Sequence, residues 1–92
     1  MIQNTLSALS DPTRREIVKL LTKGEFTAGE IVEKFDVSAP AISRHLAILK
    51  EAEIVKSARN GKCIKYSLSL DSIELLGDWI KEIIERGREN EQ

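Results

Sequence analysis

The hydrophobic pattern of this chain changes its period near Ile54, and that change limits the folds open to it. Before this point apolar residues recur every three to four positions, as on one face of a helix. After it, two short segments rich in β-formers, about 54–59 and 62–68, flank the dipeptide Asn60-Gly61. Asn-Gly in this setting is a strong hairpin signal, because both residues tolerate positive φ. A helical period then returns from Asp71, so the sequence predicts a mainly α fold with a small β-hairpin, in the order α-α-α-α-β-β-α.

Start and stop signals divide the helical part. Ser10 or Asp11 is expected to cap a second helix that begins at Pro12, and Gly24 to end it as a left-handed residue. The segment 27–30, Thr-Ala-Gly-Glu, has the pattern of a capping box at the start of a third helix. Ser38 and Asp71 are the expected caps of the fourth and last helices.

Length and composition predict one soluble domain, residues 1–92. A chain of 92 residues supports one modest core, and no window approaches the ~20 apolar residues that a membrane span needs. The single cysteine, Cys63, excludes an intrachain disulfide, and no secretory signal is evident, so we expect a cytoplasmic protein. The net charge is −1, yet residues 38–65 carry six basic and two acidic side chains, whereas residues 71–92 carry three and seven. Such asymmetry suggests one face for a polyanion, although scattered surface charge is the alternative.

The third and fourth helices form a candidate helix-turn-helix, in which the second helix enters a DNA major groove. In the fourth helix Ile42, Leu46 and Leu49 share the core side. On the other side, small residues allow the backbone to approach DNA, the free amides of the first turn suit phosphate, and basic residues add charge. The expected DNA contacts of this helix are Ser38, Ala39, Pro40, Ser43, Arg44, His45 and Lys50. The alternative to a DNA-binding motif is a helical hairpin whose polar side is only solvated.

The hairpin that follows favours DNA binding further. Its tip is basic, and Arg59, Asn60 and Lys62 are expected to contact the phosphate backbone beside the recognition helix, as a wing does. Lysines that merely blunt an exposed strand edge are the alternative. Together, helix pair and wing predict a winged helix-turn-helix.

Two segments carry a family resemblance. Residues 7–17, SALSDPTRREI, and residues 38–46, SAPAISRHL, resemble the opening signature and the recognition helix of ArsR-type winged-helix repressors, and residues 49–55 and 61–68 continue the match. The Ala52-Glu53 pair is similar to the SdpR-like autorepressor branch, where many relatives have Ala-Gly. The resemblance implies a transcriptional repressor that binds a palindromic operator in double-stranded DNA as a homodimer. It also implies that the first and last helices form the dimer interface, with Leu6, Leu75, Leu76, Trp79, Ile80 and Ile83 as the candidate residues.

The metal-sensing chemistry of many ArsR-type proteins is missing from this sequence. The third helix has no Cys or His, and Ile73 stands where the resemblance would place a ligand histidine. His45 and Cys63 are single residues on different elements, so we expect no metal site and no cofactor. A thiol switch at Cys63, an unidentified effector and a winged helix that docks another protein stay open as alternatives. An enzyme is not expected, because no acid–base pair, nucleophile or phosphate loop is apparent.

Two further assignments are left open. His45 is interpreted either as a phosphate contact or as a flank residue packed between core and surface. Arg14 and Arg15 are expected to touch phosphate or to pair with acidic groups.

The wide apolar stripe of the last helix is expected to serve partly as core, through Ile73, Leu76, Ile80 and Ile83.

Overall fold

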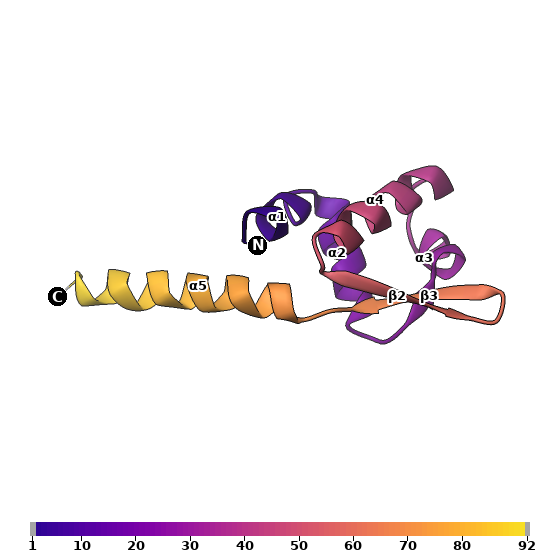
Figure 1. Cartoon of the computed structure of the whole chain (residues 1–92). Coiled ribbons are helices and arrows are strands. Elements are labelled where there is room, and N and C mark those ends of the chain that lie inside the picture. The colour runs from indigo at the N-terminus through magenta and orange to yellow at the C-terminus, as the bar shows by residue number, and fades with distance from the viewer. Residues whose placement is uncertain (1, 92) are drawn as a thin grey trace.

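The computed structural model describes residues 2–91 and confirms a winged helix-turn-helix. Helices α2, α3 and α4 pack together above a β-hairpin (Figure 1). Helix α5 extends away from this body, and α1 lies over the first turns of α5. The hairpin tip and the far end of α5 lie at opposite ends of a molecule 57 Å long. The elements are α1 (Ile2–Ala8), α2 (Pro12–Leu21), β1 (Phe26–Thr27), α3 (Ala28–Lys34), α4 (Ala39–Glu51), β2 (Val55–Asn60), β3 (Cys63–Leu68) and α5 (Asp71–Glu89).

The predicted caps are confirmed for the three middle helices. The Asp11 carboxylate accepts from the Arg14 amide at 3.1 Å at the start of α2. At α3 the capping box is complete, since the Glu30 amide donates to Thr27 Oγ1 at 3.1 Å and the Thr27 amide donates to Glu30 Oε1 at 2.8 Å. At α4 the Ala41 amide donates to Ser38 Oγ at 3.3 Å.

Two predicted helix ends are wrong. Asp71 is the first residue of α5 rather than its cap, and Leu70 before it makes no side-chain cap. Helix α2 ends at Leu21 and is closed by Thr22 in the right-handed region. Gly24, with a φ of 139°, therefore lies beyond the helix, in the connection to β1.

The hairpin forms with a turn one residue later than predicted. Asn60 pairs with Cys63, so the two-residue loop is Gly61-Lys62 and Asn60 is the last residue of β2. Gly61 has a φ of 68° and Lys62 does not have positive φ, the pattern of a turn whose first central residue is glycine. The strand β1, which the sequence reading did not include, pairs with β3 and makes a three-stranded sheet of order β1-β3-β2.

The core lies between α2, α3, α4 and the start of the wing. The predicted inward residues of α4, Ile42, Leu46 and Leu49, are all buried. They share the core with residues from each neighbouring element, namely Ala8, Ile17, Leu21, Ile31, Ala52, Ile54 and Val55. This core holds the recognition helix and the wing in a fixed relation.

The predicted core stripe of α5 is wrong for most of its length. Leu76 is buried and Ile73 packs against the core, but five large apolar side chains stay 43–56 % exposed. We call these five the α5 stripe: Leu75, Trp79, Ile80, Ile83 and Ile84. The reason is length, because the 19 residues of α5 span about 28 Å whereas the seven residues of α1 span about 10 Å. Helix α1 therefore covers only the first turns of α5.

Candidate nucleic-acid interface

The outer side of α4 presents small and basic residues to solvent. We call it the reading face: Ser38, Ala39, Pro40, Ser43, Arg44, Ala47 and Lys50, all exposed. They share one side because they alternate with the buried residues at helical spacing. Lys50 lies about 18 Å along the axis from Ser38, since twelve residues separate them. The two ends of the reading face therefore reach different phosphates.

The first turn of α4 has fewer free amides than we predicted. Pro40 has no N–H, the Ala41 amide donates to Ser38 Oγ, and the Ile42 amide donates to the Ser38 carbonyl at 3.0 Å. Among the described residues of this turn, the Ala39 N–H is the one backbone donor without an acceptor in the chain. Phosphate binding at this face therefore depends on side chains more than on the helix terminus.

His45 lies on the flank of α4 that faces α2, not on the reading face. It is half-buried, and its Nδ1 lies 3.3 Å from Nη1 of Arg14. This position agrees with the interpretation of His45 as a flank residue, and neither interpretation is tested by it. The same histidine stays a candidate for a phosphate contact at the edge of the reading face.

The arginines at the start of α2 bind the end of α1. Arg14 donates through Nε to the Ala8 carbonyl at 2.6 Å and through Nη2 to the Ser7 carbonyl at 3.4 Å. Arg15 donates to the Leu9 carbonyl at 2.8 Å. The last carbonyls of a helix have no partners within it and carry partial negative charge, so two guanidinium groups satisfy them. These bonds involve no acidic side chain, and the phosphate contact of these arginines stays a prediction.

The wing carries its basic residues at an exposed end. Arg59 pairs with Ile64 across the hairpin, and both, like Asn60 and Lys62 at the turn, are exposed. Lys56 is exposed on the stem of β2, while Lys65 on β3 is half-buried. The tip therefore extends the positive surface of α4 rather than folding back onto it.

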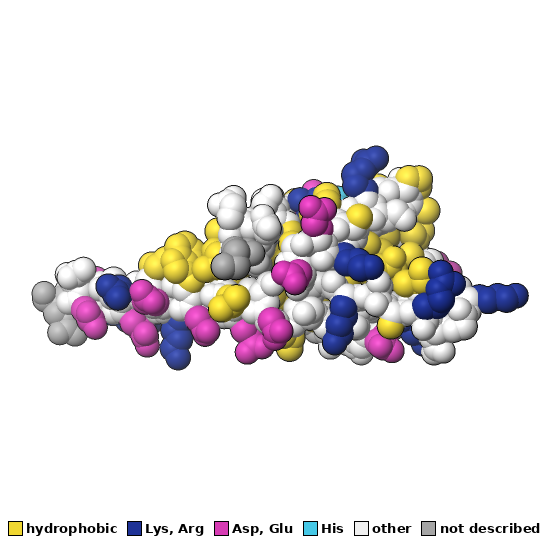
Figure 2. Space-filling model, in the orientation of Figure 1, with side chains coloured by type: hydrophobic (Ala, Val, Ile, Leu, Met, Phe, Trp, Pro, Cys, Tyr) yellow, Lys and Arg dark blue, Asp and Glu magenta, His cyan; other side chains and the backbone are white. Residues whose placement is uncertain are grey.

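Charge is separated along the molecule. Figure 2 shows Lys and Arg side chains on the hairpin end and over α4, and Asp and Glu side chains along the lower side of α5. The upper side of α5 is apolar in the same view, where the α5 stripe lies. A polyanion is attracted to the hairpin end and repelled by the polar side of α5.

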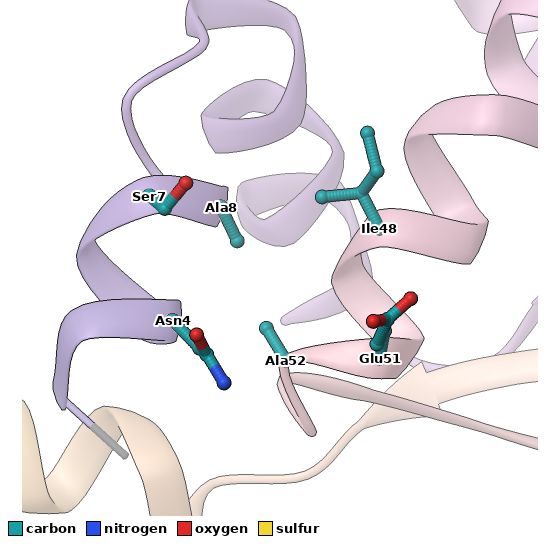
Figure 3. Close-up of a pocket in the computed structure, with 6 residues that line it drawn as sticks. All are labelled: Asn4, Ser7, Ala8, Ile48, Glu51 and Ala52. Atoms are coloured by element: carbon teal, nitrogen blue, oxygen red, sulfur yellow. The ribbon is translucent and has the colours of Figure 1, made fainter.

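A shallow pocket that was not predicted lies between α1 and the end of α4. Its volume is about 220 Å³, and Figure 3 shows Ile48 and Glu51 of α4 facing Asn4 and Ala8 of α1. Ser7 and Ala52 complete its lining. No motif could have predicted it, because its lining residues come from two elements some 40 positions apart.

The described residues bring together no group of three or more His, Cys, Asp or Glu side chains that could hold a metal ion. Cys63 is exposed beside the wing turn, and its role as a thiol switch stays a prediction. Across residues 2–91 we find no helix with the length and apolarity of a membrane span.

Comparison with known proteins identifies the family. Residues 11–57 match the sequence profile of the family described as "Bacterial regulatory protein, arsR family". The chain is 44 % identical over 86 residues to the transcriptional repressor SdpR of Bacillus subtilis, a match that covers 94 % of this chain and 96 % of SdpR.

Solved structures agree. An ArsR-like transcriptional regulator from Rhodococcus superposes with a TM-score of 0.91 at 26 % identity, over 97 % of this chain and 82 % of the other. The transcriptional repressor BigR from Xylella fastidiosa superposes with a TM-score of 0.70 at 35 % identity, over 84 % and 80 % of the two chains. The chain thus belongs to the arsR family of bacterial regulatory proteins, and it is a DNA-binding transcriptional regulator of the repressor type, not an enzyme.

Proposed function

We propose that this protein represses transcription as a homodimer on a palindromic operator, that its own promoter is among its targets, and that no metal ion is required. The two recognition helices read major-groove half-sites about one helical turn apart, which is the spacing that two-fold dimers of this kind use. Each wing contacts the flanking phosphates, and the bound dimer blocks RNA polymerase. The resemblance to the SdpR-like autorepressor branch supports the choice of target.

The observation that carries the proposal is the α5 stripe. Five large apolar side chains, including Trp79, lie on one side of a helix whose other side is charged. An apolar patch of this size on a small protein usually marks an interface. We propose that a second copy of the chain covers this stripe. Its own α5 stripe is equally apolar, and two such faces are complementary about a two-fold axis.

The proposed interface modifies the list of candidate residues in one respect. Leu6 is 40 % exposed, and Leu75, Trp79, Ile80 and Ile83 are free to meet a partner. Leu76 is 7 % exposed and already packs within the chain. Its contribution to the dimer is therefore indirect, through the packing of α1 on α5.

Fluorescence anisotropy tests the DNA-binding part of the proposal. A duplex taken from directly upstream of the protein's own gene is compared with a scrambled duplex of equal length, at near-physiological salt and with excess non-specific competitor. We expect tight binding to the upstream duplex alone, unchanged by a chelator. Equal binding to both duplexes contradicts autoregulation, and loss of binding in the chelator contradicts metal independence. No binding even at low salt contradicts the DNA-binding role and favours a module that docks another protein.

A further inference from the structure

The guanidinium of Arg14 joins three parts of the molecule. It starts on α2, donates to the carbonyls of Ser7 and Ala8 at the end of α1, and reaches His45 Nδ1 on α4 at 3.3 Å. Arginine has N–H donors only and no acceptor. A hydrogen bond in this contact therefore needs His45 Nδ1 as the acceptor, which leaves Nε2 as the N–H donor of the ring.

The second ring nitrogen of His45 faces solvent. No hydrogen bond to Nε2 is found among the described residues. At the same time, no buried side-chain nitrogen or oxygen of those residues lacks a partner, so Nε2 is not buried. His45 therefore carries an accessible ring nitrogen on the flank of α4, next to the reading face.

We propose that Arg14 is a positioning residue that holds the ring of His45 in place, so that His45 donates its Nε2–H to a DNA phosphate beside the reading face. The proposal rests on the reading face assigned above. The phosphate is the one that borders the major groove on the α2 side. The charged groups near the imidazole are Arg14 and Asp11 of α2, with Arg44 next to it in the sequence.

Two substitutions of His45 separate its two nitrogens. His45→Asn keeps a short side chain with an oxygen acceptor in reach of Arg14, whereas His45→Gln extends an amide N–H toward the position of Nε2. We expect His45→Asn to weaken operator binding by roughly tenfold to a hundredfold, the range for one hydrogen bond to a charged group, and His45→Gln to bind like the wild type. Equal affinity of His45→Asn and the wild type overturns the proposal.

A double-mutant cycle tests the dependence of His45 on Arg14. The ammonium of Arg14→Lys is too compact to reach all three acceptors, so we expect the same loss of affinity as for His45→Asn and no further loss in the double variant. Losses that add show that the two residues act independently and overturn the proposal. Thermal melting controls for folding, and the two His45 variants keep the test decisive if Arg14→Lys is unstable.

Arg44→Ala separates this inference from the proposed function. If Arg44→Ala and His45→Asn both bind operator like the wild type, the reading face itself is wrong. If only Arg44→Ala binds weakly, the reading face stands and the inference about Arg14 and His45 fails.

Discussion

The amide of Ile54 donates to the carbonyl of Leu49 at 3.0 Å, and this bond joins the end of the recognition helix to the start of the wing. The Glu53 amide donates in turn to the Lys50 carbonyl at 3.0 Å. Together the two bonds make a Schellman motif, and the apolar residues that accompany such a motif, Leu49 and Ile54, are fully buried. In this motif the residue directly before Ile54 must adopt the left-handed conformation, and it is usually glycine. Here it is Glu53, with a φ of 61°.

Glu53→Gly is expected to stabilise the protein. A residue with a Cβ loses about 1–2 kcal/mol in left-handed backbone, and glycine avoids this cost. Glycine's greater freedom in the unfolded chain offsets about 0.5–1 kcal/mol of that gain. We therefore expect the free energy of unfolding to rise by about 0.5–1 kcal/mol in urea titrations. Glu53→Ala is the matched control, because it removes the same carboxylate and keeps the strain. A glycine variant no more stable than the alanine variant contradicts the prediction.

Acid is expected to destabilise the fold through two capping carboxylates. The bond from the Arg14 amide is the main cause that lowers the pKa of Asp11 from 3.8, and the bond from the Thr27 amide is the main cause that lowers the pKa of Glu30 from 4.5. A pKa lower in the folded than in the unfolded state gives stability that is complete above the unfolded value and is lost as the pH falls through the folded value. The melting temperature should therefore fall below about pH 4.5.

The variant Glu30→Gln isolates one of these contributions. Its amide oxygen still accepts from Thr27 but does not titrate. The melting temperature of this variant should therefore fall less between about pH 5 and pH 3 than that of the wild type. Glu33→Gln, on the same helix and outside the capping box, is the control. If both variants follow the wild-type curve, the capping box is not a source of the acid sensitivity.

Ile83→Glu is expected to produce a folded monomer. Ile83 is 49 % exposed in the single chain, so a carboxylate there leaves the core intact but is costly in an apolar interface. Sedimentation should show a monomer with unchanged helix content, and operator affinity should fall because the two half-sites are no longer bound together. Lys81→Glu, on the charged side of α5, is the control. A dimeric Ile83→Glu contradicts the proposed interface, whereas Leu76→Glu is uninformative because Leu76 is buried within the chain.

Arg44→Ala is expected to weaken operator binding by about 1–3 kcal/mol if Arg44 reads a base, with scrambled DNA much less affected. Lys62→Ala, at the wing tip, should instead weaken binding to all sequences alike and reduce the salt slope by about one. Anisotropy titrations on operator and scrambled duplexes at several salt concentrations separate the two patterns. Wild-type affinity in either variant removes that residue from the interface.

The sequence predicted the helices, the wing and the side of α4 that faces outward, because these depend on local signals. The buried residues of α4 follow from helical spacing, and the capping box at Thr27 follows from two residues three positions apart. The same is true of the exposed basic residues of the reading face and the wing. Such features depend on neighbours in the chain, which a sequence displays directly.

The features that the sequence did not reveal depend on partners distant in the chain. The wide apolar stripe of α5 looks the same in a sequence whether it faces a core or a second copy, and only the short length of α1 decides between the two. The contact from Arg14 to His45 joins residues 31 positions apart, and no pattern marks it. The turn at Gly61 was misplaced by one residue because Asn-Gly and Gly-Lys are both acceptable loops.

The separation of charge along the 57 Å axis also has a kinetic consequence. Basic side chains outnumber acidic ones by six to two over residues 38–65, and acidic ones outnumber basic ones by seven to three over residues 71–92, so the chain has an electric dipole along this axis. The electric field of a DNA duplex exerts a torque on this dipole. The approaching protein therefore arrives with its reading face turned toward the duplex. Substitutions on the acidic side of α5, far from any base pair, should therefore alter how fast the operator is found while leaving how long it is held unchanged.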